Sequence, residues 1–199
     1  NSSYLKIIDH DIIDPIDINA DYVWHLACPG SPWYHIKNPI EVSMINYIGT
    51  LNMLELSRKL GAKFLLASSS EIYGDPKEHP QKENYWGYVN SIGARSCYNE
   101  GKRFAESLTF DFARTFNLDI KIARIFNTYG PRIRPSDGRV ISNFITQALK
   151  KEQFTIYGEG TQARSFCFIS DLISGLNKLM NSQHKGPFNL GNPEEINIF

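Results

Sequence analysis

The sequence has little that would direct it to nucleic acid or into a membrane. Its 199 residues carry 21 basic and 21 acidic side chains, so the formal net charge is zero. Binding to a nucleic acid or to a membrane surface through bulk charge is therefore not expected. No apolar run approaches the roughly 20 residues that a helix needs to cross a bilayer. We thus expect neither a nucleic-acid partner nor a membrane partner.

Cysteine and histidine are sparse, and neither is spaced as a set of ligands. The three cysteines are odd in number and far apart: Cys28, Cys97 and Cys167. The five histidines are also scattered, without a pair at helical spacing. These observations argue against a disulfide framework, predict no metal site, and favour a reducing, cytoplasmic setting.

Strand-like and helix-like segments alternate along the chain. A helix is predicted over 39–60, because Pro39 suits a first turn, apolar residues recur at spacings of four and three, and Gly61 follows. Further helices are predicted over 98–116, 140–150 and 170–181. Strands are predicted over 4–8, 22–27, 63–68, 120–125, 154–157 and 187–190, with a polar loop over 74–95. The alternation implies an α/β fold with a doubly wound parallel sheet.

Tyr98 and Lys102 give the strongest chemical signal. Residues four apart on a helix share a face, and an ammonium near a phenol favours the phenolate. We therefore expect Lys102 to lower the pKa of Tyr98 and make it a general base for a hydroxyl proton. The Tyr-x-x-x-Lys pattern is common by chance, so a surface helix with a solvated lysine is the alternative from the pattern alone.

Ser69 belongs to a serine run, Ser-Ser-Ser-Glu over 68–71, at the end of a predicted strand. Open α/β sheets bind ligands at the carboxyl ends of their parallel strands. Ser69 is therefore expected to share a proton network with Tyr98. Serine is also a common turn former, so an ordinary strand-end turn is the alternative.

Several segments together resemble the extended short-chain dehydrogenase/reductase superfamily, and most of all its UDP-glucuronate decarboxylase branch. They are HLACPGSP, NYIGTLNMLE, LLASSSEIYGDP, YNEGK, RIFNTYGPR, DGRVISNF, YGEGTQARSF and FNLGNPEE. The resemblance covers about residues 6–198. It implies a Rossmann-like sheet that lacks its first βαβ unit, NAD as cofactor, a UDP-sugar as substrate, and a homodimer. Residues 1–130 would form a partial NAD-binding domain, and 131–199 part of a smaller nucleotide-sugar-binding lobe interleaved with its last strands.

The resemblance also implies roles for individual residues. Tyr98 would take the proton from the sugar 4-hydroxyl, Lys102 would hold the nicotinamide ribose, and Ser69 would hydrogen-bond the reacting oxygen. The full catalytic set is Ser69, Ser70, Glu71, Tyr98, Lys102 and Arg164. The cofactor-binding set is Asp11, Ile12, Leu26, Ala27, Tyr98, Lys102 and Thr128. The substrate-binding set is Asn127, Arg139, Asn143, Tyr157 and Arg164.

Ser70 and Glu71 separate the reactions that such a site can carry out. Similar 4,6-dehydratases carry Asp-Glu here, because an acid must protonate a departing 6-hydroxyl. Decarboxylation needs no such acid. We therefore expect NAD-dependent decarboxylation of UDP-glucuronate to UDP-xylose through a 4-keto intermediate, with NAD regenerated. Glu71 and Arg164 are expected to steer the carboxylate and the returning proton.

Two features depart from that pattern. No G-x-x-G-x-x-G loop is present, so the first strand and its phosphate-binding turn are expected upstream of Asn1, in a longer enzyme. Met44 stands where the decarboxylase pattern has a lysine near the substrate carboxylate. A nucleotide-sugar 4,6-dehydratase or 4-epimerase is therefore an alternative within enzymes. A non-catalytic nucleotide-sugar binding module is the alternative outside them.

Overall fold

A four-stranded parallel sheet lies at the centre of the computed structural model, which describes residues 4–199. The strand order is β1-β2-β3-β7. These strands are β1 (Tyr22–His25), β2 (Lys63–Ser69), β3 (Ile120–Ile125) and β7 (Phe188–Leu190). Most residues of β2 and β3 are buried, which suits strands covered on both faces. The expected α/β fold with a parallel, Rossmann-like sheet is confirmed.

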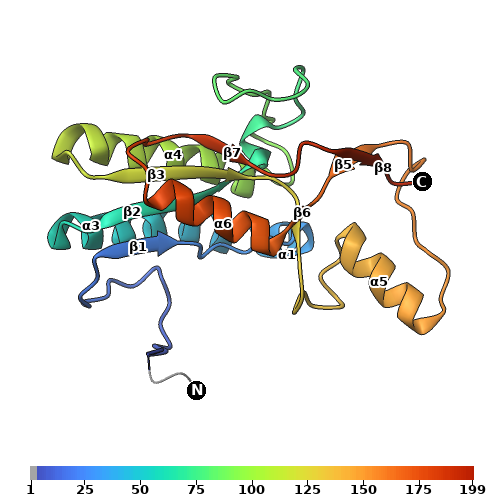
Figure 1. Cartoon of the computed structure of the whole chain (residues 1–199), viewed down its shortest axis with the longest axis horizontal. Helices are drawn as coiled ribbons and strands as arrows, with labels where there is room; N and C mark the ends of the chain where they lie inside the picture. Colours follow the sequence, from blue (N-terminus) through green and yellow to red (C-terminus); the bar gives the residue numbers. More distant parts are fainter. Residues whose placement is uncertain (1–3) are drawn as a thin grey trace.

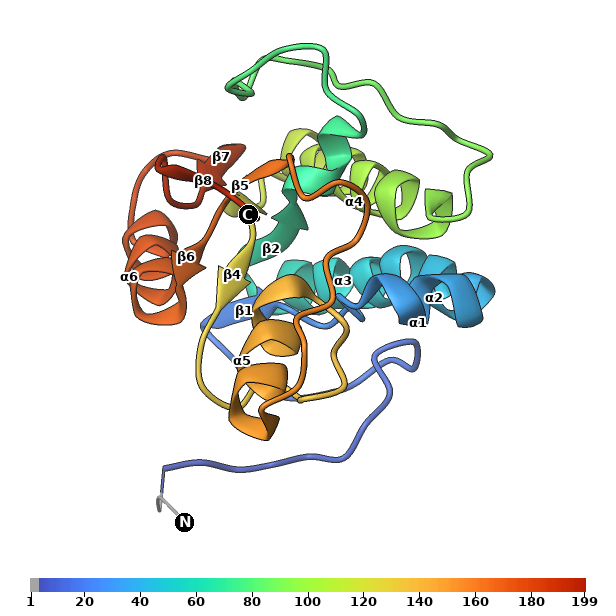
Figure 2. The same ribbon diagram turned by 90° about the vertical axis from the view of Figure 1, so that its right-hand side faces the viewer.

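Helices cover both faces of this sheet (Figures 1 and 2). One face carries a continuous helical run of α2 (Pro39–Met44), the π-helical η1 (Ile45–Gly49) and α3 (Thr50–Leu60), with α4 (Ser96–Phe116) beside it. The opposite face carries α6 (Ile169–Met180). Each layer has its own apolar core. Leu54, Phe64 and Ile122 lie in the first, and Leu65, Leu172 and Leu176 in the second.

The predicted helices and most of the predicted strands are confirmed. Pro39 lies in a first turn, and Gly61 ends the long run in the left-handed conformation, at φ +65°. The helix predicted over 140–150 is α5 (Val140–Lys150), and the other helices begin or end within two residues of their predicted bounds. The π-helical turn and the short elements α1 (Pro32–Lys37) and η2 (Ser70–Tyr73) were not foreseen.

Two predicted strands are wrong. Residues 4–8 form no strand, and the side chains of Leu5 and Ile7 are 69% and 83% exposed. Residues 154–157 also form no strand. There the ring of Phe154 packs against Phe144 of α5, with 5.1 Å between ring centroids. A short apolar run becomes a strand only where a neighbouring strand can accept its backbone hydrogen bonds, and neither segment has one in the described part of the chain.

Four short strands form pairs outside the main sheet. β4 (Thr128–Tyr129) pairs with β6 (Cys167–Phe168), and β5 (Ala163–Ser165) pairs with β8 (Glu195–Asn197). In Figure 1, α5 and the β5–β8 pair lie beyond the carboxyl ends of the central strands, whereas α6 and β7 return to the sheet. No helix among residues 4–199 is both long and apolar enough to span a membrane. The division of the chain at residues 130 and 131 stays a prediction.

Candidate active site

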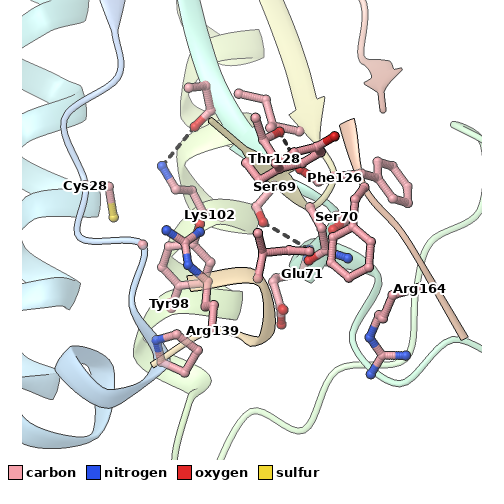
Figure 3. Close-up of a pocket in the computed structure, with 18 of the residues that line it drawn as sticks. Cys28, Ser69, Ser70, Glu71, Tyr98, Lys102, Phe126, Thr128, Arg139 and Arg164 are labelled. Carbon is pink, nitrogen blue, oxygen red and sulfur yellow. Dashed lines mark hydrogen bonds between the residues drawn. The ribbon is translucent and has the colours of Figure 1, made fainter. Parts of the chain in front are cut away.

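A cavity of about 430 Å³ opens at the carboxyl ends of β2 and β3, and residues at the start of α5 and in β5 also line it (Figure 3). Parallel strands end at one edge of a sheet, so residues far apart in sequence meet there. Ten of the predicted site residues line this cavity: Leu26, Ser69, Ser70, Glu71, Tyr98, Lys102, Asn127, Thr128, Arg139 and Arg164. Most of the predicted site thus lies around a single space.

The remaining predicted residues lie elsewhere. Asp11, Ile12 and Ala27 line a smaller neighbouring hollow, and Cys28 borders both spaces. Asn143 and Tyr157 line neither of them. The Asn143 amide donates to the carbonyl of Gly138 at 3.3 Å, and the side chain of Tyr157 is 65% exposed. A role of these last two residues in substrate binding stays a prediction.

Tyr98, Ser69 and Lys102 meet at one end of the cavity (Figure 3). Ser69 lies near enough to the Tyr98 hydroxyl to lower its pKa through a side-chain hydrogen bond. The Ser69 Oγ also accepts a hydrogen bond from the Glu71 amide at 3.2 Å. The Lys102 Nζ lies 5.8 Å from the Tyr98 ring centroid and donates to the carbonyl of Ala67 at 2.9 Å. The proximity expected from a strand tip followed by a helix is therefore present.

The protonation of Tyr98 differs from the expectation. Burial raises the pKa of Tyr98 to about 12, although the hydrogen bond from Ser69 lowers it in part. The predicted lowering by Lys102 is wrong for the free protein, because Lys102 is not among the main groups that shift this pKa and its ammonium donates to a backbone carbonyl. Burial also lowers the pKa of Lys102 itself. The resting site therefore holds a neutral phenol.

His35 is a site residue that the sequence did not reveal. Its ring stacks on the ring of Tyr98, with 4.2 Å between centroids and 14° between planes. The His35 side chain is fully buried, its Nε2–H donates to the carbonyl of Pro29 at 2.8 Å, and its Nδ1 has no partner. Burial is the main cause that lowers its pKa, so the neutral ring is favoured. No motif marks this histidine, and the short helix α1 that carries it was not predicted.

Arg95 is a second residue that the sequence did not reveal. It lies just before α4, lines the cavity, and pairs with Glu71 at 3.3 Å. Its Nε is buried without a partner. Met44, by contrast, is 41% exposed at the end of α2 and is not one of the residues that line the cavity. The departure from the decarboxylase pattern at Met44 therefore lies away from the cavity.

The cavity carries more positive than negative charge. Arg95, Lys102, Arg139 and Arg164 line it, against Glu71. Arg139 pairs with Asp137, and Arg164 donates to the carbonyl of Ala163 at 2.7 Å. Such a lining suits an anionic ligand that bears phosphate or carboxylate groups. Among residues 4–199, no group of three or more histidine, cysteine or acidic side chains is placed to hold a metal ion.

A parallel α/β sheet whose strand-tip serine faces a tyrosine and a lysine one helical turn apart defines a short-chain dehydrogenase/reductase. Within that class, the model of the NAD dependent epimerase/dehydratase family matches residues 4–191. The chain therefore belongs to this family.

Individual relatives agree with this assignment. The chain is 56% identical over 198 residues to UDP-glucuronic acid decarboxylase 4 of Arabidopsis thaliana, covering 100% of this chain and 45% of that protein. It thus spans about half the length of this relative. A UDP-N-acetylglucosamine 4-epimerase from Methanobrevibacter ruminantium has a similar structure, with TM-score 0.92 and 27% identity over 100% of this chain and 64% of that one. A UDP-glucuronic acid 4-epimerase from Bacillus cereus was solved with UDP-glucuronic acid and NAD. It matches with TM-score 0.78 and 30% identity, covering 89% of this chain and 56% of that one.

Proposed function

We propose that the whole protein containing this chain is an NAD-dependent UDP-glucuronate decarboxylase, which forms UDP-xylose and carbon dioxide. One observation carries the proposal. Tyr98, Ser69 and Lys102 line one cavity in a chain that is 56% identical to a UDP-glucuronic acid decarboxylase. The chain covers 45% of that relative, so the activity is assigned to the whole protein.

The arrangement of the two hollows fits NAD. Asp11 and Ile12 line the smaller hollow, Cys28 borders both, and Tyr98 and Lys102 lie in the larger one. We assign the adenine end of the dinucleotide to Asp11 and Ile12, and the nicotinamide ribose to Lys102. When bound, oxidised NAD supplies a positive charge and the acceptor for the hydride that leaves C4 of the sugar and later returns to it.

Tyr98 acts as the base that takes the proton of the sugar 4-hydroxyl. Because its pKa is about 12 in the free protein, base action depends on groups that favour the phenolate. The hydrogen bond from Ser69 and the charge of Arg95 both lower this pKa. Ser69 also holds the reacting oxygen beside the phenol. The Lys102 ammonium lies close enough to add its charge if it turns from Ala67 toward the ribose and the phenol.

Carbon dioxide leaves once C4 is a ketone. The carboxylate on C5 is then β to a carbonyl, so the electrons of the breaking C–C bond enter an enolate. C5 takes a proton, the hydride returns to C4, and Tyr98 returns its proton to the oxygen on C4. We assign Glu71 and Arg164, which both line the cavity, to the carboxylate and to the proton delivered to C5.

The same site geometry leaves related reactions to be excluded. A 4-epimerase would use Tyr98 and Ser69 alike but keep the carboxylate, and one solved relative acts as a UDP-glucuronic acid 4-epimerase. A 4,6-dehydratase would need an acid at the position of Ser70. Identity above 50% to a decarboxylase, against 30% to that epimerase, favours decarboxylation.

Product analysis tests the proposal. The whole protein is incubated with NAD and, in parallel, with UDP-glucuronate, UDP-glucose and dTDP-glucose, and the products are separated and identified. The proposal predicts UDP-xylose and carbon dioxide from UDP-glucuronate, without added reductant. UDP-galacturonate would indicate an epimerase, and a 4-keto-6-deoxy sugar a dehydratase. Binding of UDP-glucuronate without turnover would indicate a non-catalytic module.

A homodimer in the cytoplasm completes the proposal. Large apolar side chains are exposed on the outer side of the α2–η1 run and of α4, which supports pairing with a second copy. They include Ile40 (78% exposed), Met44 (41%), Tyr47 (48%) and Phe104 (47%). The rings of Tyr47 and Phe104 contact edge to face, at 5.4 Å between centroids. Sedimentation of the whole protein at micromolar concentration tests this, and a monomer there would contradict it.

A further inference from the structure

Helix α4 is attached to strand β2 and to the following turn η2 on both sides of Tyr98. Before Tyr98 along the helix, Arg95 pairs with Glu71 at 3.3 Å. After it, Lys102 donates to the carbonyl of Ala67 at 2.9 Å (Figure 3). The reacting pair is thus held between two attachments. A third attachment, one turn further along α4, takes no part in the chemistry proposed above.

Glu106 makes this third attachment. The Ser68 Oγ donates to Glu106 Oε1 at 2.5 Å, and Ser68 directly precedes Ser69. Arg124 of β3 donates to both oxygens of the same carboxylate, from Nε at 3.0 Å and from Nη2 at 2.8 Å. The relative exposures of Ser68, Glu106 and Arg124 are 3%, 8% and 8%. A carboxylate with three donors from two strands fixes its own position and theirs.

Arg124 extends the network behind the strand tip. Its Nη1 donates to the hydroxyl of Tyr73 at 2.9 Å and to the carbonyl of Glu83 at 2.7 Å. The Tyr73 hydroxyl donates in turn to Asn189 Oδ1 at 2.8 Å. Residues of β2, β3, η2 and β7 therefore meet α4 in one hydrogen-bond network, and the first three of these segments also line the cavity.

We propose that Glu106 is a positioning residue, which fixes the tip of β2 through Ser68 and so sets the approach of Ser69 to Tyr98. The inference rests on the proposed function, in which Ser69 and Tyr98 are the reacting pair. Glu106 touches neither substrate nor cofactor in this account. Its effect on the reaction passes through Ser68 and the backbone that joins Ser68 to Ser69.

Stability alone is a poor explanation for such a group. Burying an ion pair removes both charges from water, and well-packed apolar residues often stabilise a core as well. The bidentate ion pair and the hydroxyl bonded to it are directional, so they fix distances and angles that an apolar contact leaves free. Small displacements of reacting groups lower the rate by large factors, so a fixed geometry matters most at the strand tip beside Ser69.

The test needs a variant that removes the contact to Ser68 without unfolding the protein. Glu106→Ala would leave Arg124 buried and unpaired, and that protein could simply fail to fold. Ser68→Ala removes only the hydroxyl and keeps the ion pair between Glu106 and Arg124. Ser57→Ala is the matched control. Ser57 is fully buried on α3, and its hydroxyl donates within its own helix, to the carbonyl of Met53 at 2.8 Å.

Steady-state kinetics of the whole protein give the first readout. With whichever nucleotide sugar the wild type converts, Ser68→Ala should lower kcat about tenfold and leave KM nearly unchanged. Ser57→Ala should keep both constants within about twofold of wild type. A merely structural defect would instead lower the folded fraction of Ser68→Ala and leave kcat per folded molecule as in wild type.

The titration of Tyr98 gives a second readout that needs no turnover. Ser69, Cys28, Glu71 and Arg95 act on the pKa of the hydroxyl, while His35 and Lys102 lie near the ring, and Ser68→Ala replaces none of these residues. In protein labelled with fluorotyrosine, the signal assigned with the Tyr98→Phe variant is followed by fluorine NMR. Loosening the hydrogen bond from Ser69 should raise this pKa by about 0.5 unit or more in Ser68→Ala.

The outcomes separate the inference from the function. If Tyr98 titrates alike in the Ser68→Ala and Ser57→Ala proteins, the inference is overturned, whatever the value of kcat. If the wild type does not convert UDP-glucuronate, the proposed function fails, and the titration alone decides the inference. An upward shift confined to Ser68→Ala supports it.

Discussion

The ring of His35 lies against the ring of Tyr98, 4.2 Å away and inclined by 14°. The histidine is buried completely, and its Nε2–H is engaged by the carbonyl of Pro29. Helix α1 thus supports one face of the phenol, while Ser69 acts on the hydroxyl and lowers its pKa in part. The phenol is held by packing on its ring and by the interaction of its hydroxyl with Ser69. A substitution that removes only the hydroxyl therefore separates the two contributions.

Tyr98→Phe removes the hydroxyl and keeps the ring that stacks on His35. We expect turnover to fall by about 10³-fold or more, since the base is lost. The free energy of unfolding should stay within about 1 kcal/mol of wild type, because one hydrogen bond is removed and the packing is kept. Progress curves and urea denaturation check the two parts. Strong activity in Tyr98→Phe would remove Tyr98 from the chemistry.

His25 should make the fold sensitive to acid. Burial, and to a smaller degree the charge of Lys102, lowers the pKa of His25 to about 3 from an ordinary 6.5. Between these values the unfolded chain binds a proton that the folded chain does not, so stability rises with pH. We expect the free energy of unfolding to fall by about 1.4 kcal/mol per pH unit as the pH drops from about 6 to 4.

The slope of stability against pH can be assigned to His25 with two variants. His25→Asn should flatten it by most of that amount, measured by urea denaturation of the whole protein. His184→Asn, at an exposed histidine, should leave the slope as in wild type. An unchanged slope in His25→Asn would show that His25 does not stay neutral in the folded state.

Substitution by alanine should change the stability of the protein in opposite directions at two helical glycines. At Gly101 of α4 an added Cβ would lie 2.9 Å from Asn46 Nδ2 and 3.0 Å from its Cβ. Asn46 is 2% exposed, and its Nδ2 donates to the carbonyl of Val42 at 2.9 Å, so it has little freedom to move. Gly101→Ala should destabilise the protein by about 1–3 kcal/mol.

Gly175→Ala is the matched change in α6. There the nearest atoms to an added Cβ are methyl carbons of Leu190 at 3.5 and 3.7 Å, which is ordinary contact. The substitution should stabilise the protein by about 0.5–1 kcal/mol, because alanine favours a helix interior. Urea denaturation of both variants checks the pair, and equal signs would contradict the packing of α4 against Asn46.

The sequence was sufficient to predict the sheet, the long helices and the core of the site. Pro39 and Gly61 mark the ends of a long helical run by local chemistry that does not depend on tertiary structure. The meeting of Ser69 with Tyr98 follows from the order of strand and helix, because parallel strands present their carboxyl ends at one edge.

The predictions that were wrong concerned residues whose structure depends on neighbours distant in sequence, which a local sequence pattern does not reveal. The runs at 4–8 and 154–157 look like strands, but no strand in the described chain lies beside them. Lys102 was expected to act on the Tyr98 hydroxyl, yet its nearest acceptor is the carbonyl of Ala67. His35 reaches Tyr98 through a short helix that carries no motif. Each outcome is set by tertiary contacts, not by local propensity.

The most direct measurement of the central claim is the fate of UDP-glucuronate in deuterated water. The whole protein with NAD should yield UDP-xylose that carries a single deuterium atom, on C5, because the proton that replaces carbon dioxide comes from solvent while the hydrogen on C4 returns as hydride. NMR and mass spectrometry of the isolated sugar nucleotide detect this label. UDP-galacturonate with its carboxylate intact and no deuterium on C5 would contradict the account.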